Sequence, residues 1–145
     1  MEFATPHPWR DLGQHPHITV HWVNMPGEAW GLTDGRRNIL MSRRLLQSQR
    51  RVTLAHEMEH IKRGHVGCQP PTVERLVRHH AARYLLPDLR AVLDELIFYR
   101  GDWVHAAEDL WVDVPTLQAR LDSRHTHPAE KAIIRRRLEE DPCHD

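Results

Sequence analysis

The chain contains 145 residues, 40% of them hydrophobic, and its 20 basic and 20 acidic side chains give a formal net charge of zero. This balance excludes the strongly basic surface of a general nucleic-acid-binding protein, and no apolar run approaches the roughly 18 residues that indicate a membrane-spanning helix. The N-terminal residues lack the pattern of a signal peptide, and the two cysteines lie far apart in the sequence. We therefore expect one compact cytoplasmic protein without a disulfide framework.

Three short strands are predicted in the first third of the chain. Residues 18–23 alternate between apolar and polar side chains, and residues 29–32 and 38–41 follow as further strands. The turn-forming residues 33–35 join the last two strands. We expect a three-stranded antiparallel sheet, in which the stretch Trp30–Thr33 or its neighbour lines a binding cleft, because an edge strand commonly holds an extended peptide as an added strand.

The most informative segment is a predicted helix from about Leu45 to Arg63, which contains neither Pro nor Gly. Ser42 is the candidate cap before it, and Gly64 follows at its end. The helix contains the pentapeptide His-Glu-Met-Glu-His at residues 56–60, an H-E-x-x-H pattern. This pattern is typical of zinc hydrolases, and it is the starting point for every functional expectation below.

The spacing of the two histidines predicts a shared metal ion. Residues four apart on a helix are separated by only about 40° around its axis, so the imidazoles of His56 and His60 can reach one ion. Because the chain contains 13 histidines, the pentapeptide alone is a moderate signal. However, the apolar residues Leu54, Met58 and Ile61 lie on another side of the helix. This arrangement favours a metal site over a pair of solvated surface histidines.

Two glutamates accompany the histidines, and they differ in their expected roles. Glu57 and Glu59 lie at similar angles to either side of the histidine direction, so helical geometry alone does not separate them. In H-E-x-x-H zinc hydrolases, the Glu directly after the first His takes a proton from the attacking water. Glu57 is therefore the candidate general base, and Glu59 is interpreted as a solvated or supporting acid.

A second predicted helix supplies a candidate third ligand. It begins after Pro70 and Pro71 with Thr72 as its cap, and it ends near Leu86. Glu74 falls within its apolar face, where burying a carboxylate costs free energy unless the carboxylate is paired or binds a metal. Because catalytic zinc usually takes three protein ligands, we interpret Glu74 as the third ligand. The alternative is a solvent-facing acid that the helix dipole favours in the first turn.

Other polar residues near the motif fit less well as ligands. His65 does not have the spacing of the third histidine in the metzincin pattern H-E-x-x-H-x-x-G-x-x-H. His79 and His80 are expected on the outward half of the second helix, and Cys68 lies in the loop between the two helices. Four residues stay open as groups that stabilise an oxyanion or orient a ligand, namely Tyr84, His79, His80 and His65.

The rest of the chain is predicted to be helical, over residues 88–99, 103–111, 114–124 and 127–140. Residues 104–121 have the A-x-x-L-x-V spacing of a helix-turn-helix, although Trp111 occupies the turn position that usually holds Gly. The second helix of this unit offers only Arg120 and Arg124 to a phosphate backbone, and acidic residues surround it. Direct nucleic-acid binding is therefore not favoured, and we expect a packing element or a surface that docks a protein substrate.

Residues 53–65 (TLAHEMEHIKRGH) resemble the signature of the ImmA/IrrE metallo-endopeptidases, in particular the arginine-rich versions carried by phages and mobile elements. The resemblance continues in residues 74–87 (ERLVRHHAARYLLP), and with the predicted strands it covers about residues 18–90. It implies one Zn²⁺ per chain, held by the three candidate ligands with Glu57 as base. One departure is Arg78, which stands where Asn or Asp is common in the family and cannot accept a hydrogen bond from a ligand histidine.

The resemblance also implies a fold and a substrate. The fold class is α+β, with a minimal zincin-like metallopeptidase core at residues 1–100, a small helical part at residues 101–140 that packs on it, and a disordered tail at residues 141–145. The implied function is cytoplasmic cleavage, in a bacterial host cell, of a helix-turn-helix repressor of a phage or mobile element. The alternative is a regulatory module that binds DNA or the repressor and has a structural or non-catalytic zinc site.

Overall fold

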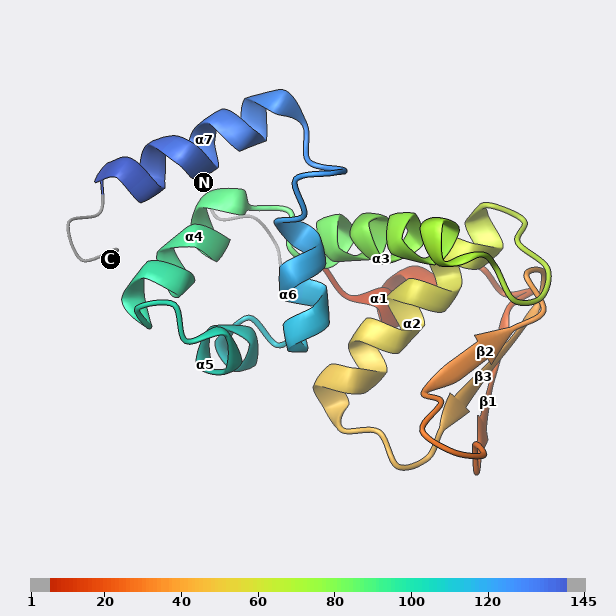
Figure 1. Cartoon of the computed structure of the whole chain (residues 1–145). Helices are drawn as coiled ribbons and strands as arrows, with labels where there is room; N and C mark the ends of the chain where they lie inside the picture. Colours follow the sequence, from red (N-terminus) through yellow and green to blue (C-terminus); the bar gives the residue numbers. More distant parts are fainter. Residues whose placement is uncertain (1–5, 141–145) are drawn as a thin grey trace.

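The computed structural model of the protein describes residues 6–140, and within this range it contains seven helices and a three-stranded sheet (Figure 1). The expected α+β class is confirmed, whereas the predicted disordered tail at residues 141–145 lies outside the described residues. In chain order the elements are α1 (Pro8–Leu12), β1 (Thr19–Val23), β2 (Gly31–Thr33), β3 (Asn38–Ser42), α2 (Gln47–Lys62), α3 (Pro71–Leu85), α4 (Leu89–Phe98), α5 (Trp103–Asp109), α6 (Val114–Arg120) and α7 (Pro128–Glu140). Within the described range, every helix is too short or too polar to cross a bilayer.

The sheet is mixed, so the expectation of an antiparallel sheet is wrong. Its strand order is β1-β3-β2, in which β3 pairs in parallel with β1 and antiparallel with β2. An antiparallel sheet would form if each strand paired with the next one in sequence. Ile39 and Met41 of β3 are fully buried, so this strand takes the central position, and residues 24–30 are long enough to carry the chain past it. The more exposed strands β1 and β2 form the edges.

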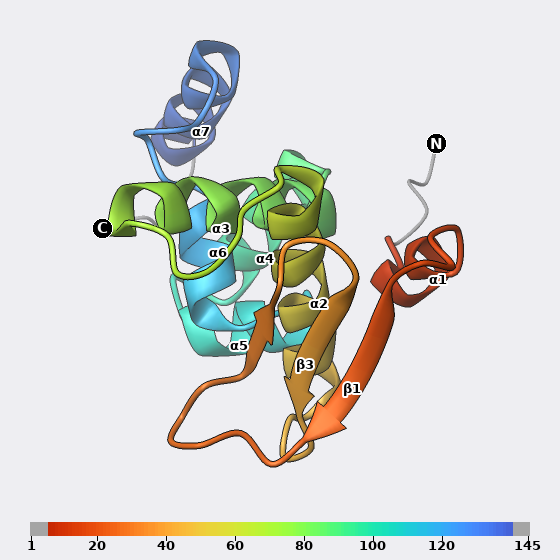
Figure 2. The same ribbon diagram turned by 90° about the vertical axis from the view of Figure 1, so that its right-hand side faces the viewer.

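The helix α2 lies against the sheet, and one hydrophobic cluster joins them (Figure 2). Ile39 and Met41 pack there with Leu54 of α2. The expected cap Ser42 is instead the last residue of β3, and the helix begins later because the Oε1 atom of Gln49 accepts the backbone N–H of Leu46 at 2.9 Å. The expected end is confirmed, since Gly64 follows α2 with a positive φ of 68°.

The helix α3 begins at Pro71 rather than after a Thr72 cap. A proline suits the first helical position, because its missing N–H has no partner there in any case. The expected inward face is confirmed at Val77, Ala81 and Leu85, which are all buried. Through this face α3 packs against both α2 and the helices that follow it in sequence.

The helices α4 to α7 gather on the side of α3 away from the sheet (Figure 1). In the helix-turn-helix-like unit, Ala107 and Leu117 are buried in one cluster with Ala55 of α2, and Trp111 adopts the left-handed φ of 60° that the turn position requires. Arg120 is only 1% exposed, and its guanidinium donates to the Leu86 carbonyl at 2.7 Å and to Glu130 at 2.8 Å. The unit therefore packs against the core, and Arg120 is not available to a phosphate backbone.

Candidate metal centre

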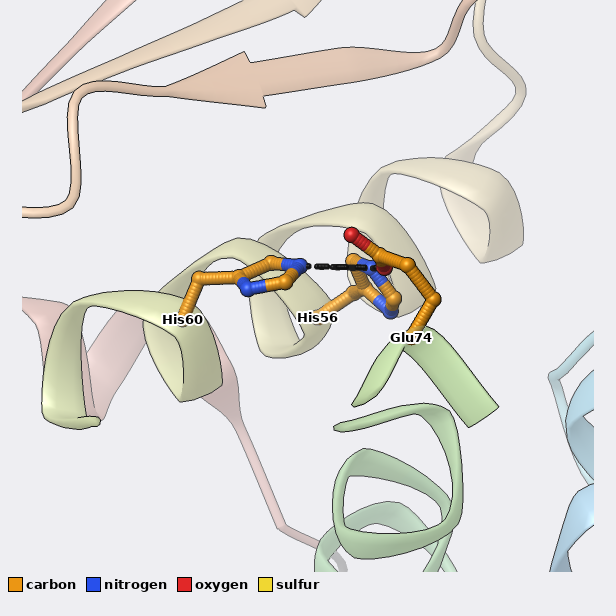
Figure 3. Close-up of side chains that lie close together, drawn as sticks. All are labelled: His56, His60 and Glu74. Carbon is orange, nitrogen blue, oxygen red and sulfur yellow. Dashed lines mark hydrogen bonds and ion pairs between the residues drawn. The ribbon is translucent and has the colours of Figure 1, made fainter. Parts of the chain in front are cut away.

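Three side chains from α2 and α3 converge on one point (Figure 3). His56 and His60 project from adjacent turns of α2, and Glu74 reaches them from the first turn of α3. The Nε2 atoms of the two histidines lie 3.2 Å apart, and each lies 3.2 Å from the Oε2 atom of Glu74. The structure therefore brings together the three residues that the sequence analysis selected, and this cluster could hold a metal ion.

The equal spacing matches one face of a metal-centred tetrahedron. Zinc binds imidazole nitrogen and carboxylate oxygen at about 2.0–2.1 Å, which separates tetrahedral ligand atoms by roughly 3.3–3.4 Å. Hydrogen bonds explain the triangle less well, because each imidazole Nε2 either donates one proton or accepts one, and three mutual contacts cannot all be satisfied. Two imidazoles and one carboxylate also form a donor set typical of catalytic zinc sites, which leave a fourth position open.

His65 orients one of these ligands. Its Nδ1 atom lies 3.0 Å from the Nδ1 atom of His60, and its backbone N–H donates to the His60 carbonyl at 3.0 Å. When the Nδ1–H of His60 donates to His65, the Nε2 lone pair of His60 faces Glu74 and is free to bind a cation. The left-handed turn at Gly64 brings His65 back to α2. Among the four residues left open by the sequence, His65 is the one that contacts the cluster.

Glu57 lies beside the cluster and is only 7% exposed. Burial raises the pKa of its carboxyl to about 7, and the negative charge of Glu74 acts in the same direction. A pKa near neutrality suits a group that must both accept and release a proton. Glu57 and His56 line one cavity of about 420 Å³. Glu59, in contrast, accepts from the Nε–H of Arg63 at 2.9 Å and lines a different cavity.

Burial keeps His56 suited to bind a cation. Burial lowers the pKa of His56, and so does the adjacent His60, whereas Glu74 raises it. A neutral imidazole offers its lone pair to a metal, because protonation would block that position. The desolvated setting therefore favours the form of His56 that binds a metal.

The strand β2 approaches this site closely because position 31 is glycine. A Cβ atom at Gly31 would lie 2.6 Å from the Cγ2 atom of Thr53 and 3.1 Å from the Leu40 carbonyl oxygen. Trp30 and Gly31 line the same cavity as His56 and Glu57, so the expectation that this stretch borders a cleft is confirmed for these two residues.

The outer edge of β2 has no strand partner within the described residues. The backbone of Ser42 donates to the Trp30 carbonyl at 2.9 Å, and Asp34 donates to the Asn38 carbonyl at 3.2 Å. In an antiparallel pair, residues alternate between facing the partner strand and facing away. The backbone groups of Gly31 and Thr33 therefore point outward, toward the free edge.

The other three candidates lie away from the metal cluster. The hydroxyl of Tyr84 donates to Asp11, and its side chain lines the cavity that contains Glu59. The expectation that His79 faces outward is wrong. It is 2% exposed, and its Nδ1 atom lies 2.9 Å from the Ala119 carbonyl oxygen, because α6 covers that side of α3. Burial lowers the pKa of His79 and of the half-buried His80, which packs edge-on against the His79 ring.

Arg78 is the residue whose place in the site the sequence analysis missed. It lines the cavity with His56 and Glu57, and its positive charge is one cause that lowers the pKa of His56. In the sequence, Arg78 stands out only as a departure from a family pattern. The signal was its spacing, since a residue four positions after Glu74 lies one turn further along the same helix face.

Comparison of the chain with protein-family models, with curated proteins and with solved structures finds no significant match.

Proposed function

We propose that the protein is a zinc-dependent endopeptidase. The observation that carries the proposal is the triangle of His56, His60 and Glu74 ligand atoms, each pair 3.2 Å apart, together with the buried Glu57, which lines one open cavity with His56. When bound, the zinc ion acts as a Lewis acid, which lowers the pKa of a water molecule and polarises a carbonyl group. A purely structural zinc site would instead be expected to have four protein ligands.

The residues of the site bind the metal ion and transfer the proton. His56, His60 and Glu74 hold the ion and leave one position facing the cavity. Glu57 takes the proton of the water as its oxygen attacks the peptide carbonyl. Glu57 then passes this proton to the amide nitrogen as the carbon–nitrogen bond breaks, which releases an amine and a carboxylic acid that then ionises. Its raised pKa supports both halves of this proton transfer.

The free edge of β2 supports a peptide as the substrate. An extended chain can add to this edge as a further strand and pair with the outward backbone groups of Gly31 and Thr33. The edge borders the cavity that contains Glu57, so a bound chain would pass the metal. Backbone pairing of this kind depends little on the side chains of the bound peptide. It can therefore form at an internal segment of a chain, which suits an endopeptidase.

The substrate is proposed from the sequence resemblance of residues 53–65 and 74–87. It is a helix-turn-helix repressor of a phage or mobile element, cut in the cytoplasm of a bacterial cell. The geometry supports the coarser part of this proposal, an extended peptide segment.

The test compares three preparations of the full chain, namely zinc-loaded wild type, wild type stripped with a chelator, and zinc-loaded Glu57→Gln. Each is incubated with a mixture of unstructured peptides and with a purified helix-turn-helix repressor. New chain ends are identified by mass spectrometry. We expect new ends only with zinc-loaded wild type. Absence of cleavage in all three preparations, or equal cleavage by Glu57→Gln, would contradict the proposal.

A further inference from the structure

The cavity lined by His56 and Glu57 adjoins a second groove between α3 and α6. The first has a volume of about 420 Å³ and the second of about 320 Å³, and Arg78 and Pro115 line both. Arg75 and Arg124 also line the second groove. A peptide that passes the metal cluster can therefore extend directly into this groove.

The second groove carries an excess of positive charge. Its lining includes three arginines, and Asp122 is the acidic residue among them. Asp122 already pairs with Arg124 at 2.8 Å. No hydrogen bond or ion pair within residues 6–140 involves the side chain of Arg75 or Arg78. Two guanidinium groups thus face the groove with their donors uncommitted.

Within residues 6–140, none of the acidic groups nearby forms an ion pair with these two arginines. Glu28 and Asp113 line the first cavity. The Asp113 carboxylate is committed to the start of α6, where it accepts the backbone N–H of Thr116 at 3.0 Å. The positive charge therefore lies where the two cavities meet and beyond, on the side of α3 that faces α6.

We infer that Arg75 and Arg78 form a subsite for an acidic side chain of the peptide substrate, close to the bond that is cut. The inference rests on the proposed function and adds a sequence preference to it. A guanidinium binds a carboxylate through two parallel N–H donors, which gives directional recognition as well as attraction. Because Arg78 lines the cavity of Glu57 and His56, the recognised residue lies only a short way along the chain from the scissile bond.

The occupant that fits this surface is a peptide rather than a nucleic acid. Nucleic-acid binding requires a row of basic residues that follows the phosphate backbone. Here two uncommitted arginines face the groove, and the chain as a whole has a net charge of zero. One or two carboxylates on a peptide match this charge.

Binding tests the subsite independently of cleavage. The zinc-loaded Glu57→Gln protein is titrated into two labelled pools of short peptides, which have Glu or Gln at one fixed central position and random residues elsewhere. Fluorescence anisotropy at low salt should show about tenfold tighter binding of the Glu pool. The preference for the Glu pool should disappear in the double variant Arg75→Gln with Arg78→Gln. It should persist in part in the double variant Arg75→Lys with Arg78→Lys. The double variant Arg75→Glu with Arg78→Glu should instead prefer a third peptide pool, which has Lys at the fixed position.

The control removes the same charge elsewhere. Arg90 and Arg135 are exposed and lie outside the groove, so Arg90→Gln with Arg135→Gln should keep the preference. Equal binding of the two pools, or a preference that survives the loss of Arg75 and Arg78, would overturn the inference. Binding of a single-stranded DNA probe that depends on these two arginines would also overturn it.

Cleavage separates the inference from the proposed function. If the wild type cuts peptides and the new ends show no enrichment of Asp or Glu at a fixed distance from the cut, the subsite is wrong and the endopeptidase stands. If the Glu pool binds selectively and zinc-loaded wild type cuts neither pool nor the helix-turn-helix protein, the endopeptidase is wrong, and Arg75 and Arg78 bind acidic peptides without a role in cleavage.

Discussion

The α-carbon of Gly31 faces the side chain of Glu57 so closely that a Cβ atom there would lie 3.5 Å from the Glu57 Cγ atom. The edge strand β2 therefore packs closely against the side chain of Glu57. The residue proposed to move the proton thus lies next to the strand proposed to hold the substrate backbone. The contact also covers Glu57 and contributes to the burial that raises its pKa to about 7.

Gly31→Ala should destabilise the protein and impair cleavage. The added methyl group meets the buried Thr53 and the Leu40 backbone, and such overpacking costs about 1–3 kcal/mol of unfolding free energy. Leu32→Ala is the matched control, because Leu32 is 51% exposed and adjacent in the strand. Urea denaturation compares the two variants. Equal unfolding free energies would contradict the close packing of β2 on α2.

His65→Leu should weaken zinc binding without unfolding the protein. The change removes the group that holds the Nδ1 atom of His60, and loss of such a partner typically weakens metal affinity about 10–100-fold. His65→Asn retains an acceptor and should lose less. Competition against a chromophoric chelator measures the Kd of each variant. An unchanged Kd for His65→Leu would remove His65 from the site.

Glu74→Gln should lower zinc retention, because the third ligand atom loses its negative charge. Glu59→Gln is the matched control, because it also removes a carboxylate near the H-E-x-x-H motif. The Glu59 carboxylate pairs with Arg63 and not with the two histidines. Metal analysis after gel filtration should give close to one zinc per chain for the control and clearly less for Glu74→Gln. Full zinc occupancy in Glu74→Gln would assign the third ligand to another residue.

The metal-free protein should lose stability as pH rises through the pKa of Glu57. Its folded pKa of about 7 lies above the ordinary value of 4.5, so the folded state binds this proton more tightly than the unfolded state. The resulting stabilisation is fully present below about pH 4.5 and is lost as pH rises through about 7.

Glu57→Gln removes this pH dependence. Relative to wild type, the metal-free variant should gain up to about 3 kcal/mol of unfolding free energy near pH 8 and little below about pH 5. Chemical denaturation in the presence of a chelator measures the difference. Parallel pH profiles for the two proteins would contradict the burial of an ionisable Glu57 in the folded state.

Much of the site was predictable because its determinants are local. The four-residue spacing of His56 and His60 fixes their shared direction on any helix. The position of Glu74 within an apolar helix face indicated that its carboxylate needs a partner. The α+β class followed in the same way from alternating and helical patterns along the chain.

The errors concern contacts between distant segments. The strand order depends on which strand is buried most deeply. No local pattern in residues 18–42 indicates which of the three strands that is. His79 is buried because α6 covers it, although its helix position alone indicated an exposed side chain. Arg78 was missed for the same reason, since the groove it lines exists only where α6 meets α3.

The proposed function depends on His56, His60 and Glu74 binding one zinc ion with a fourth position open. Zinc K-edge X-ray absorption on the protein loaded with one equivalent of zinc measures this coordination. We expect four nitrogen or oxygen neighbours at about 2.0 Å, with scattering from two imidazole rings. A sulfur neighbour at about 2.3 Å, or a spectrum without imidazole scattering, would contradict it.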